Sequence, residues 1–263
     1  MLTLIRGAGD LASGIALRLY RSGMQVVMTD LPKPLAIRRT VAFSEAIVHG
    51  KTEVEGVRAE RAETAQQAME LVRAGKIAVL ADPELDEARK VHPDVIVDAI
   101  LAKKNTGTTI DDAPVVIGVG PGFTAGEDCH AVVETMRGHT LGRTIYRGSA
   151  LPNTNIPGLI GGFAGERVLR APKDGVFTPE REIGDTVRTG ECVGFVDGAE
   201  VLSTLDGVLR GLIAEGTQVF AGLKIGDVDP RSEKDYCFTA SDKALAIGGG
   251  VLEAILHLTH PFK

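Results

Sequence analysis

The sequence predicts an α/β protein with a Rossmann-like parallel-sheet domain, a small all-β sandwich and a C-terminal helix. Three observations carry this prediction. The chain opens with strand, glycine turn, helix and strand over Leu2–Asp30; apolar runs then alternate with helical patterns; and residues 174–229 contain an internal duplication. Alternating strands and helices are typical of a doubly wound parallel sheet. We expect domains over residues 1–165, 166–232 and 233–263, with the last helix packing on the first domain.

The opening stretch resembles a dinucleotide-binding unit in its order and spacing. The apolar run Leu2–Ile5 suits a buried strand, and a G-x-G-x-x-A turn starts at Gly7. Gly7 and Gly9 allow a tight turn and close approach of a pyrophosphate to the helix N-terminus. A second apolar run ends in Asp30, where a ribose-binding carboxylate is expected, and no arginine follows it directly, which favours NAD over NADP. Alternatively, the glycines serve only strand-to-helix packing and Asp30 caps the next segment.

Further elements of the first domain follow in order. We expect a helix over Leu35–Ala46, a strand over Val54–Ala59, a helix over Thr64–Ala74, a strand over Lys76–Ala81, a short helix from Asp82 to Glu87 and a strand over Asp94–Ala99. Ligands of doubly wound sheets gather beyond the carboxyl ends of the strands. Lys103, after the last of these strands, is therefore a candidate for contact with a phosphate or carboxylate. Arg38 and Arg39 either reach an anionic ligand or are solvated surface residues.

A second glycine-rich loop follows the apolar run at Pro114–Gly118. It contains Gly120, Gly122, Phe123 and Thr124, and this density of small residues indicates close approach of the backbone to a ligand or to another part of the chain. We hypothesise that this loop and the Gly7 turn form one anion-binding cleft across the strand ends.

A metal site is not favoured after this loop. His130 and Glu134 would share one face of a predicted helix, beside Cys129. Two ligands on one helix do not make a site, and a lone histidine is more often simply hydrogen-bonded. We therefore predict no metal ion.

A connector rich in glycine, proline and asparagine over Arg147–Gly165 separates the first domain from the duplication. Asp174-Gly175-Val176 recurs as Asp206-Gly207-Val208, 32 residues later, and several glycines and valines recur at the same spacing. This pattern resembles the biotinyl and lipoyl carrier fold, a small β-sandwich of two quasi-symmetric halves. The expected carrier hairpin, Asp197–Glu200, has no lysine, so the resemblance implies the architecture without a carrier role, and indicates a structural or interaction module.

Composition narrows the function classes. The chain has 263 residues, a net charge of −6, 44% apolar residues, no tryptophan and three tyrosines. This charge argues against a general nucleic-acid or anionic-membrane surface, and few aromatic residues are available to stack bases. The three cysteines lie far apart, and no stretch is long enough to span a bilayer. We expect a cytoplasmic protein whose partners are small molecules or proteins. The composition does not decide between a monomer and a homo-oligomer.

Five motifs together resemble one family, the YqeB-type accessory proteins of the selenium-dependent molybdenum hydroxylase system. They are Gly7–Ala12, Arg38–Glu45, Gly120–Gly126, Gly226–Arg231 and Ser241–Ala244. The resemblance runs from end to end and implies a role in maturing molybdenum hydroxylases, with molybdopterin as a candidate ligand and a hydroxylase or another maturation protein as a candidate partner. The first domain is also similar in type to the Rossmann domain of XdhC-like accessory proteins.

Two functional hypotheses of different class remain. One is a non-catalytic maturation factor that holds a nucleotide- or pterin-like anionic ligand. The other is an NAD-dependent oxidoreductase or other nucleotide-using enzyme with Lys103, Lys104, His130 or Lys243 near the chemistry. No catalytic residues are assigned. The candidate ligand-binding residues are Gly7, Gly9, Asp10, Leu11, Asp30, Lys103, Gly120, Gly122, Phe123 and Thr124.

Overall fold

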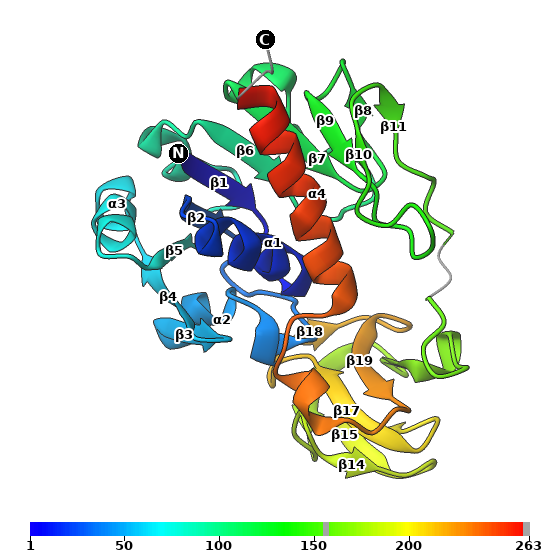
Figure 1. Ribbon diagram of the computed structural model, residues 1–263. Coiled ribbons are helices and arrows are strands. Elements are labelled where there is room, and N and C mark those ends of the chain that lie inside the picture. Colours follow the sequence, from blue (N-terminus) through cyan, green and yellow to red (C-terminus); the bar gives the residue numbers. More distant parts are fainter. Residues whose placement is uncertain (155–157, 260–263) are drawn as a thin grey trace. The chain divides into compact units, whose positions relative to one another are not determined.

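The computed structural model describes residues 1–154 and 158–259, and the chain divides into two compact units (Figure 1). The first unit comprises Met1–Pro34, Ala42–Thr154 and the described part of Ala240–Lys263. The second unit comprises Leu35–Val41 and the described part of Asn155–Thr239. The chain therefore leaves the first unit and returns to it twice.

The first unit is built on a nine-stranded sheet of order β10-β9-β7-β6-β1-β2-β5-β4-β3. Its strands are β1 (Leu2–Arg6), β2 (Gln25–Thr29), β3 (Lys51–Val54), β4 (Val57–Ala62), β5 (Ile77–Leu80), β6 (Val95–Asp98), β7 (Val115–Val119), β9 (Ala131–Val133) and β10 (Thr144–Ile145). Its helices are α1 (Asp10–Arg21), α2 (Glu45–His49), α3 (Ala65–Arg73) and α4 (Asp242–Thr259). The strands β8 (Thr124–Ala125) and β11 (Gly148–Ser149) form a separate two-stranded ribbon.

The predicted Rossmann-like, doubly wound parallel sheet is wrong, because the sheet is mixed. Strands β9, β7, β6, β1, β2, β5 and β4 are parallel, whereas β3 and β10 pair antiparallel with their neighbours. The predicted short helix from Asp82 to Glu87 is also wrong, because the described connection from β5 to β6 holds a 3₁₀ turn at Ala88–Val91 instead, and the connection from β6 to β7 holds another at Ile110–Asp112. Pro83 and Pro93 bracket the first of these connections and leave little room for an α-helix.

Local predictions in the first unit have different outcomes. The helix over Thr64–Ala74 is confirmed as α3, with the Thr64 side chain accepting a hydrogen bond from the Gln67 amide (3.2 Å). The strand over Val54–Ala59 is wrong: Glu55 and Gly56 have φ of +49° and +78°, the left-handed pair of a tight hairpin turn between β3 and β4.

The helix predicted over Leu35–Ala46 is also wrong. This stretch contains a 3₁₀ turn at Arg39–Val41 and only the start of α2. The reason is tertiary, because the chain passes into the second unit at Leu35 and returns at Ala42.

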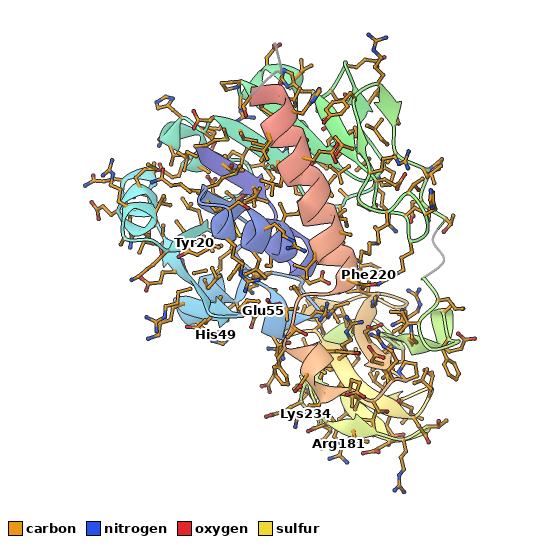
Figure 2. All side chains as sticks on the ribbon, viewed as in Figure 1. Tyr20, His49, Glu55, Arg181, Phe220 and Lys234 are labelled. Atoms are coloured by element: carbon orange, nitrogen blue, oxygen red, sulfur yellow. The ribbon has the colours of Figure 1, made fainter. Side chains whose placement is uncertain are left out.

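Helix α4 packs against α1 inside the first unit, and the two run side by side (Figure 1). Small residues allow this approach: a Cβ added to Gly14 would lie 2.5 Å from the Ala244 Cβ. Two side chains labelled in Figure 2, Tyr20 of α1 and Glu55 of the turn between β3 and β4, make polar contacts elsewhere in the first unit. Tyr20 Oη donates to the Gly75 carbonyl (2.6 Å), and Glu55 accepts from the Ala240 amide (2.7 Å) just before α4.

The second unit consists of two four-stranded antiparallel sheets, ordered β12-β19-β17-β14 and β16-β15-β13-β18. Its strands are β12 (Val168–Arg170), β13 (Gly175–Pro179), β14 (Thr186–Val187), β15 (Cys192–Val196), β16 (Ala199–Leu202), β17 (Gly207–Leu212), β18 (Gln218–Val219) and β19 (Lys224–Asp229). The duplication is confirmed, since β13, β14 and β15 each begin 32 residues before β17, β18 and β19. The repeats exchange their short strands, as β14 pairs with β17 and β18 with β13.

Both sheets follow the repeat: β12 and β16 begin 31 residues apart, and replacing each strand by its counterpart converts one strand order into the other. The predicted biotinyl/lipoyl-like sandwich, formed by residues 166–232 alone, is nevertheless wrong for this unit, because a segment from outside that range is part of it. The segment Leu35–Val41 also belongs here, where the Leu212 amide donates to the Ile37 carbonyl (2.8 Å). This division differs from the predicted ranges 1–165, 166–232 and 233–263; residues 155–157 of the predicted connector and 260–263 of the last range lie outside the described residues.

Candidate functional site

The carboxyl ends of the parallel strands β1, β6 and β7 lie at one edge of the sheet in the first unit. Gly7 follows β1 and Gly120 follows β7, and the segment after β6 lies between them. A Cβ on Gly7 would lie 2.9 Å from the Ala99 carbonyl oxygen, and one on Gly122 would lie 2.6 Å from the Lys104 Cα. The two glycine-rich turns thus share an edge, and each packs on the Ala99–Lys104 segment.

The Gly7 turn is held by two backbone hydrogen bonds and one from a serine side chain. Gly7 has φ of +101°, which favours glycine, and its amide donates to the Thr29 carbonyl (2.8 Å). The Ala8 carbonyl accepts from the Ser44 amide (2.9 Å) and from Ser13 Oγ (3.2 Å). The position of the first turn of α1 is therefore fixed by its surroundings.

The N-terminus of α1 has no side-chain cap among the described residues. Gly9 occupies the N-cap position with ordinary extended dihedrals, φ −69° and ψ −177°, and a Cβ added there would meet nothing within 4 Å. Asp10 and Leu11, the next two predicted ligand residues, form the first turn and are half-buried. The amide groups and the dipole of such a helix end favour an anion.

Asp30 lies directly after β2 and faces the Gly7 turn. Its Oδ2 accepts from the Ala8 amide and its Oδ1 from the Leu31 amide, both at 2.8 Å. Burial raises the pKa of the Asp30 carboxyl, while the hydrogen bonds from Leu31 and Ala8 oppose that rise. Each carboxylate oxygen retains a lone pair for a ligand hydroxyl.

Lys243, in the first turn of α4, carries an ammonium group that could bind an anion. Burial and the neighbouring Arg137 charge lower its pKa, whereas Asp10, Glu134 and Asp242 raise it. Arg137 is itself held by Asp242 through two hydrogen bonds of 2.9 and 3.1 Å. Lys243 has no hydrogen bond or ion pair with any residue that the structure describes.

The second glycine-rich loop is held by left-handed glycines, apolar packing and hydrogen bonds. Gly120 and Gly122 have φ of +82° and +112°. Phe123 is 4% exposed and packs in an apolar cluster with Val116, so it is a core residue. Thr124 belongs to β8; its amide donates to Asp128 Oδ2 (2.7 Å) and its hydroxyl contacts Ser149 Oγ (3.0 Å).

Lys103 lies exposed after β6 with φ of +63°. A buried network fixes the base of its loop: Asp98 pairs with Arg6 (3.1 Å) and accepts from Thr108 Oγ1 (2.6 Å), and Asn105 donates to the Thr108 carbonyl (2.8 Å). The Arg6–Asp98–Thr108 network was not predicted from the sequence, because Arg6 lies 92 residues from Asp98 and 102 from Thr108.

The predicted helix carrying His130 and Glu134 is wrong, because β9 occupies this stretch. His130 Nδ1 accepts from the Val116 amide (3.0 Å). The buried Glu134 carboxylate accepts from the amides of Thr135, Met136 and Leu151. Burial raises the pKa of the Cys129 thiol to about 11, so it is not a reactive thiolate at neutral pH. No group of metal-binding side chains occurs within residues 1–154 and 158–259.

Comparison with known proteins finds one extensive sequence match. The chain is 50% identical over 259 residues to the uncharacterized protein YqeB of Escherichia coli K12, a match that covers 98% of this chain. The chain spans about half, 48%, of the length of that relative. This likeness supports a YqeB-type protein and does not bear on a selenium-dependent hydroxylase role or an XdhC-like domain. No family model matches the chain.

Three of the similar solved structures are described as succinylglutamate desuccinylase or aspartoacylase proteins. One from Rhodobacter sphaeroides is 31% identical but covers 24% of this chain and 21% of its own, with a TM-score of 0.22. Those from Mesorhizobium loti and a Silicibacter species are 10% and 13% identical, each covering 86% of this chain and 84% of its own, with TM-scores of 0.29 and 0.26. None of these descriptions concerns molybdenum, a Rossmann domain or a biotinyl carrier.

None of the helices that the structure describes is both long enough and apolar enough to cross a membrane.

Proposed function

We propose that the first unit binds the anionic group of a nucleotide- or pterin-like ligand at the N-terminus of α1. The observation that carries this proposal is Lys243, a partly buried ammonium without a described hydrogen-bond or ion-pair partner, in the electrostatic neighbourhood of Asp10. An anion at the uncapped helix end would offset the unfavourable burial of the lysine charge. Open space above Gly9 admits such a group.

The substitution Gly9→Ala tests this proposal. Its methyl group enters the open space, and replacing an N-cap glycine by alanine costs less than about 1 kcal/mol of folding free energy. We expect Gly9→Ala and Lys243→Met each to weaken binding of the ligand at least about tenfold in calorimetric titrations. Titrants are NAD, ADP and molybdopterin, and Gly249→Ala, also open within 4 Å but in α4, is the matched control.

Unchanged affinity in both site variants would overturn the proposal. Binding of NAD that is lost in Asp30→Ala would favour the alternative, an NAD-dependent oxidoreductase or other nucleotide-using enzyme. Binding of molybdopterin without NAD would favour a non-catalytic accessory protein.

The maturation of selenium-dependent molybdenum hydroxylases stays a prediction that rests on the resemblance in the sequence. Its test is capture of a hydroxylase subunit by the purified chain, with Gly9→Ala as the variant that separates ligand binding from partner binding. Capture by both forms would support a partner surface away from the ligand site.

A further inference from the structure

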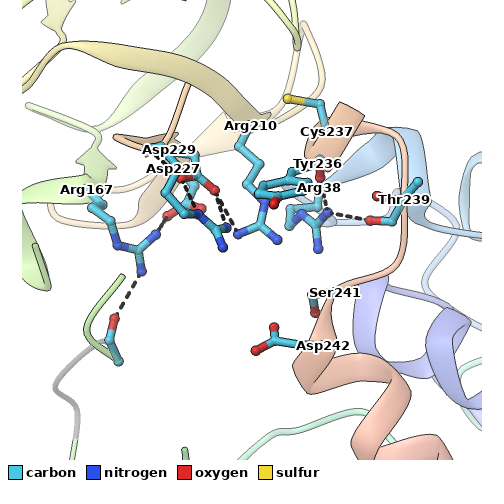
Figure 3. Close-up of polar contacts among 12 residues, drawn as sticks. Arg38, Arg167, Arg210, Asp227, Asp229, Tyr236, Cys237, Thr239, Ser241 and Asp242 are labelled. Carbon is cyan, nitrogen blue, oxygen red and sulfur yellow. Dashed lines mark hydrogen bonds and ion pairs between the residues drawn. The ribbon is translucent and has the colours of Figure 1, made fainter. Parts of the chain in front are cut away.

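A cluster of charged side chains lies within the second unit, on β17, on β19 and in the turn after β19 (Figure 3). Arg210 comes from β17, Asp227 and Asp229 from β19, Arg231 from the following turn and Arg38 from the Leu35–Val41 segment. The cluster includes the three charged residues of the Gly226–Arg231 motif, which neither functional hypothesis used.

The two aspartates already have close arginine partners without Arg210. Asp229 is fully buried, and Arg231 binds both its oxygens, Nε to Oδ1 at 2.9 Å and Nη2 to Oδ2 at 2.6 Å. Arg167 Nη1 donates to Asp227 Oδ1 at 3.0 Å. Arg38 donates to the carbonyls of Tyr236 and Thr239 at 2.9 and 3.0 Å.

Arg210 differs from these neighbours. It is 5% exposed, its Nη1 forms an ion pair with Asp229 Oδ2 at 3.4 Å that is too long for a strong hydrogen bond, and its buried Nε has no hydrogen-bond partner among the residues that the structure describes. A guanidinium has five N–H donors, and buried donors in native proteins are nearly always satisfied by protein, water or an ion. Burial and the Arg38 charge lower the pKa of Arg210, although Asp229 and Asp227 oppose that change.

We propose that Arg210 binds the phosphate group of a small anionic ligand, with Arg231 and Arg38 beside it. The planar fork of a guanidinium matches two oxygens of a phosphate. A dianion also neutralises more than one of the grouped arginines, which a single carboxylate does not. The Arg231 side chain is 40% exposed, so the cluster is open to solvent at that residue.

Calorimetric titration of the full chain with inorganic phosphate, at constant ionic strength set with sodium chloride, tests this site. We expect the unsubstituted chain and Arg188→Met, an exposed arginine of the same unit, to bind phosphate equally. Arg210→Met should weaken binding at least about tenfold. Arg210→Lys keeps the positive charge but loses the planar pair of donors, so its affinity for phosphate should lie between those of the unsubstituted chain and Arg210→Met. It is the test variant if the methionine form does not fold.

Two results would overturn the proposal: no phosphate binding by the unsubstituted chain, or equal affinity in that chain and both Arg210 variants. A higher affinity for glycerol phosphate than for inorganic phosphate would support the proposal and identify a phosphomonoester as the ligand class. Equal affinities for the two would support free phosphate as the ligand. Gly9→Ala should retain this binding, so failure of the first-unit site and failure of this one are distinguishable.

Discussion

Single residues carry the clearest electrostatic signals in this protein. Lys243, Asp30 and Arg210 are all charged groups whose pKa values are shifted against the charged form, mainly by burial. In the sequence, Asp30 stands out by its place at the end of an apolar run, whereas Lys243 is only one of four candidates near a hypothetical chemistry. Lys243 does not stand out because the groups that surround it, Asp10, Glu134 and Arg137, are far away along the chain.

The stability of the first unit should depend on pH through Lys243. Its folded-state pKa lies below the unfolded value of about 10.4, so in the window between the two the unfolded chain holds the extra proton. Stability therefore rises with pH across that window, and the charge destabilises the fold below it. We expect Lys243→Met to flatten this rise in urea unfolding between neutral pH and pH 10.

The exposed Lys33, replaced by methionine, is the control for that experiment. An equal pH dependence in the unsubstituted protein and Lys243→Met would show that the lysine charge is not disfavoured in the folded state.

At the scale of elements, the packing of α4 on α1 depends on small residues rather than on periodicity alone. The sequence showed an apolar final helix and a glycine triplet, and we expected that helix to return to the first domain. The close partners, such as Gly14 and Ala244, follow only from the tertiary structure, because ridges of two helices separated by more than two hundred residues meet there.

Substitution of Gly14 by alanine should destabilise the first unit. The added Cβ would lie 2.5 Å from the Ala244 Cβ and 2.9 Å from its carbonyl carbon, so the helices must separate. We expect a loss of about 1–3 kcal/mol in the free energy of unfolding, reduced by the better helix propensity of alanine. Urea unfolding followed by circular dichroism measures it.

Gly249→Ala, in the same pair of helices, is the matched control. Nothing lies within 4 Å of the added Cβ, so propensity alone should act and stabilise by up to about 1 kcal/mol. Equal effects of the two substitutions would contradict close packing at Gly14.

At the scale of the whole molecule, each unit is built from segments that are not consecutive in the sequence. Leu35–Val41 lies between two first-unit segments in sequence but is part of the second unit. Ile37 and Arg39 hold it to β17, through the Leu212 amide and carbonyl at 2.8 Å each. The residue pattern around Arg38 predicted a helix because the prediction considered only neighbouring residues in the sequence and not the contacts with β17.

Hydrogen exchange should therefore group Leu35–Val41 with the second unit. As urea is raised, we expect the Leu212 amide and this segment to lose protection together with β17, separately from β2 and α2, which flank the segment in sequence. Mass spectrometry of peptic fragments measures this, and loss of protection together with β2 would contradict the division.

The sequence by itself determined the opening strand, turn, helix and strand, the α3 helix and the 32-residue repeat, because each depends on local periodicity, turn glycines or spacing. The tertiary structure alone decided the mixed sheet, the exchange of short strands between the repeats, the assignment of Leu35–Val41 and the surroundings of Lys243 and Arg210. These features are pairings of segments far apart in the chain, and their energies arise from burial and long-range contact, which no local pattern encodes.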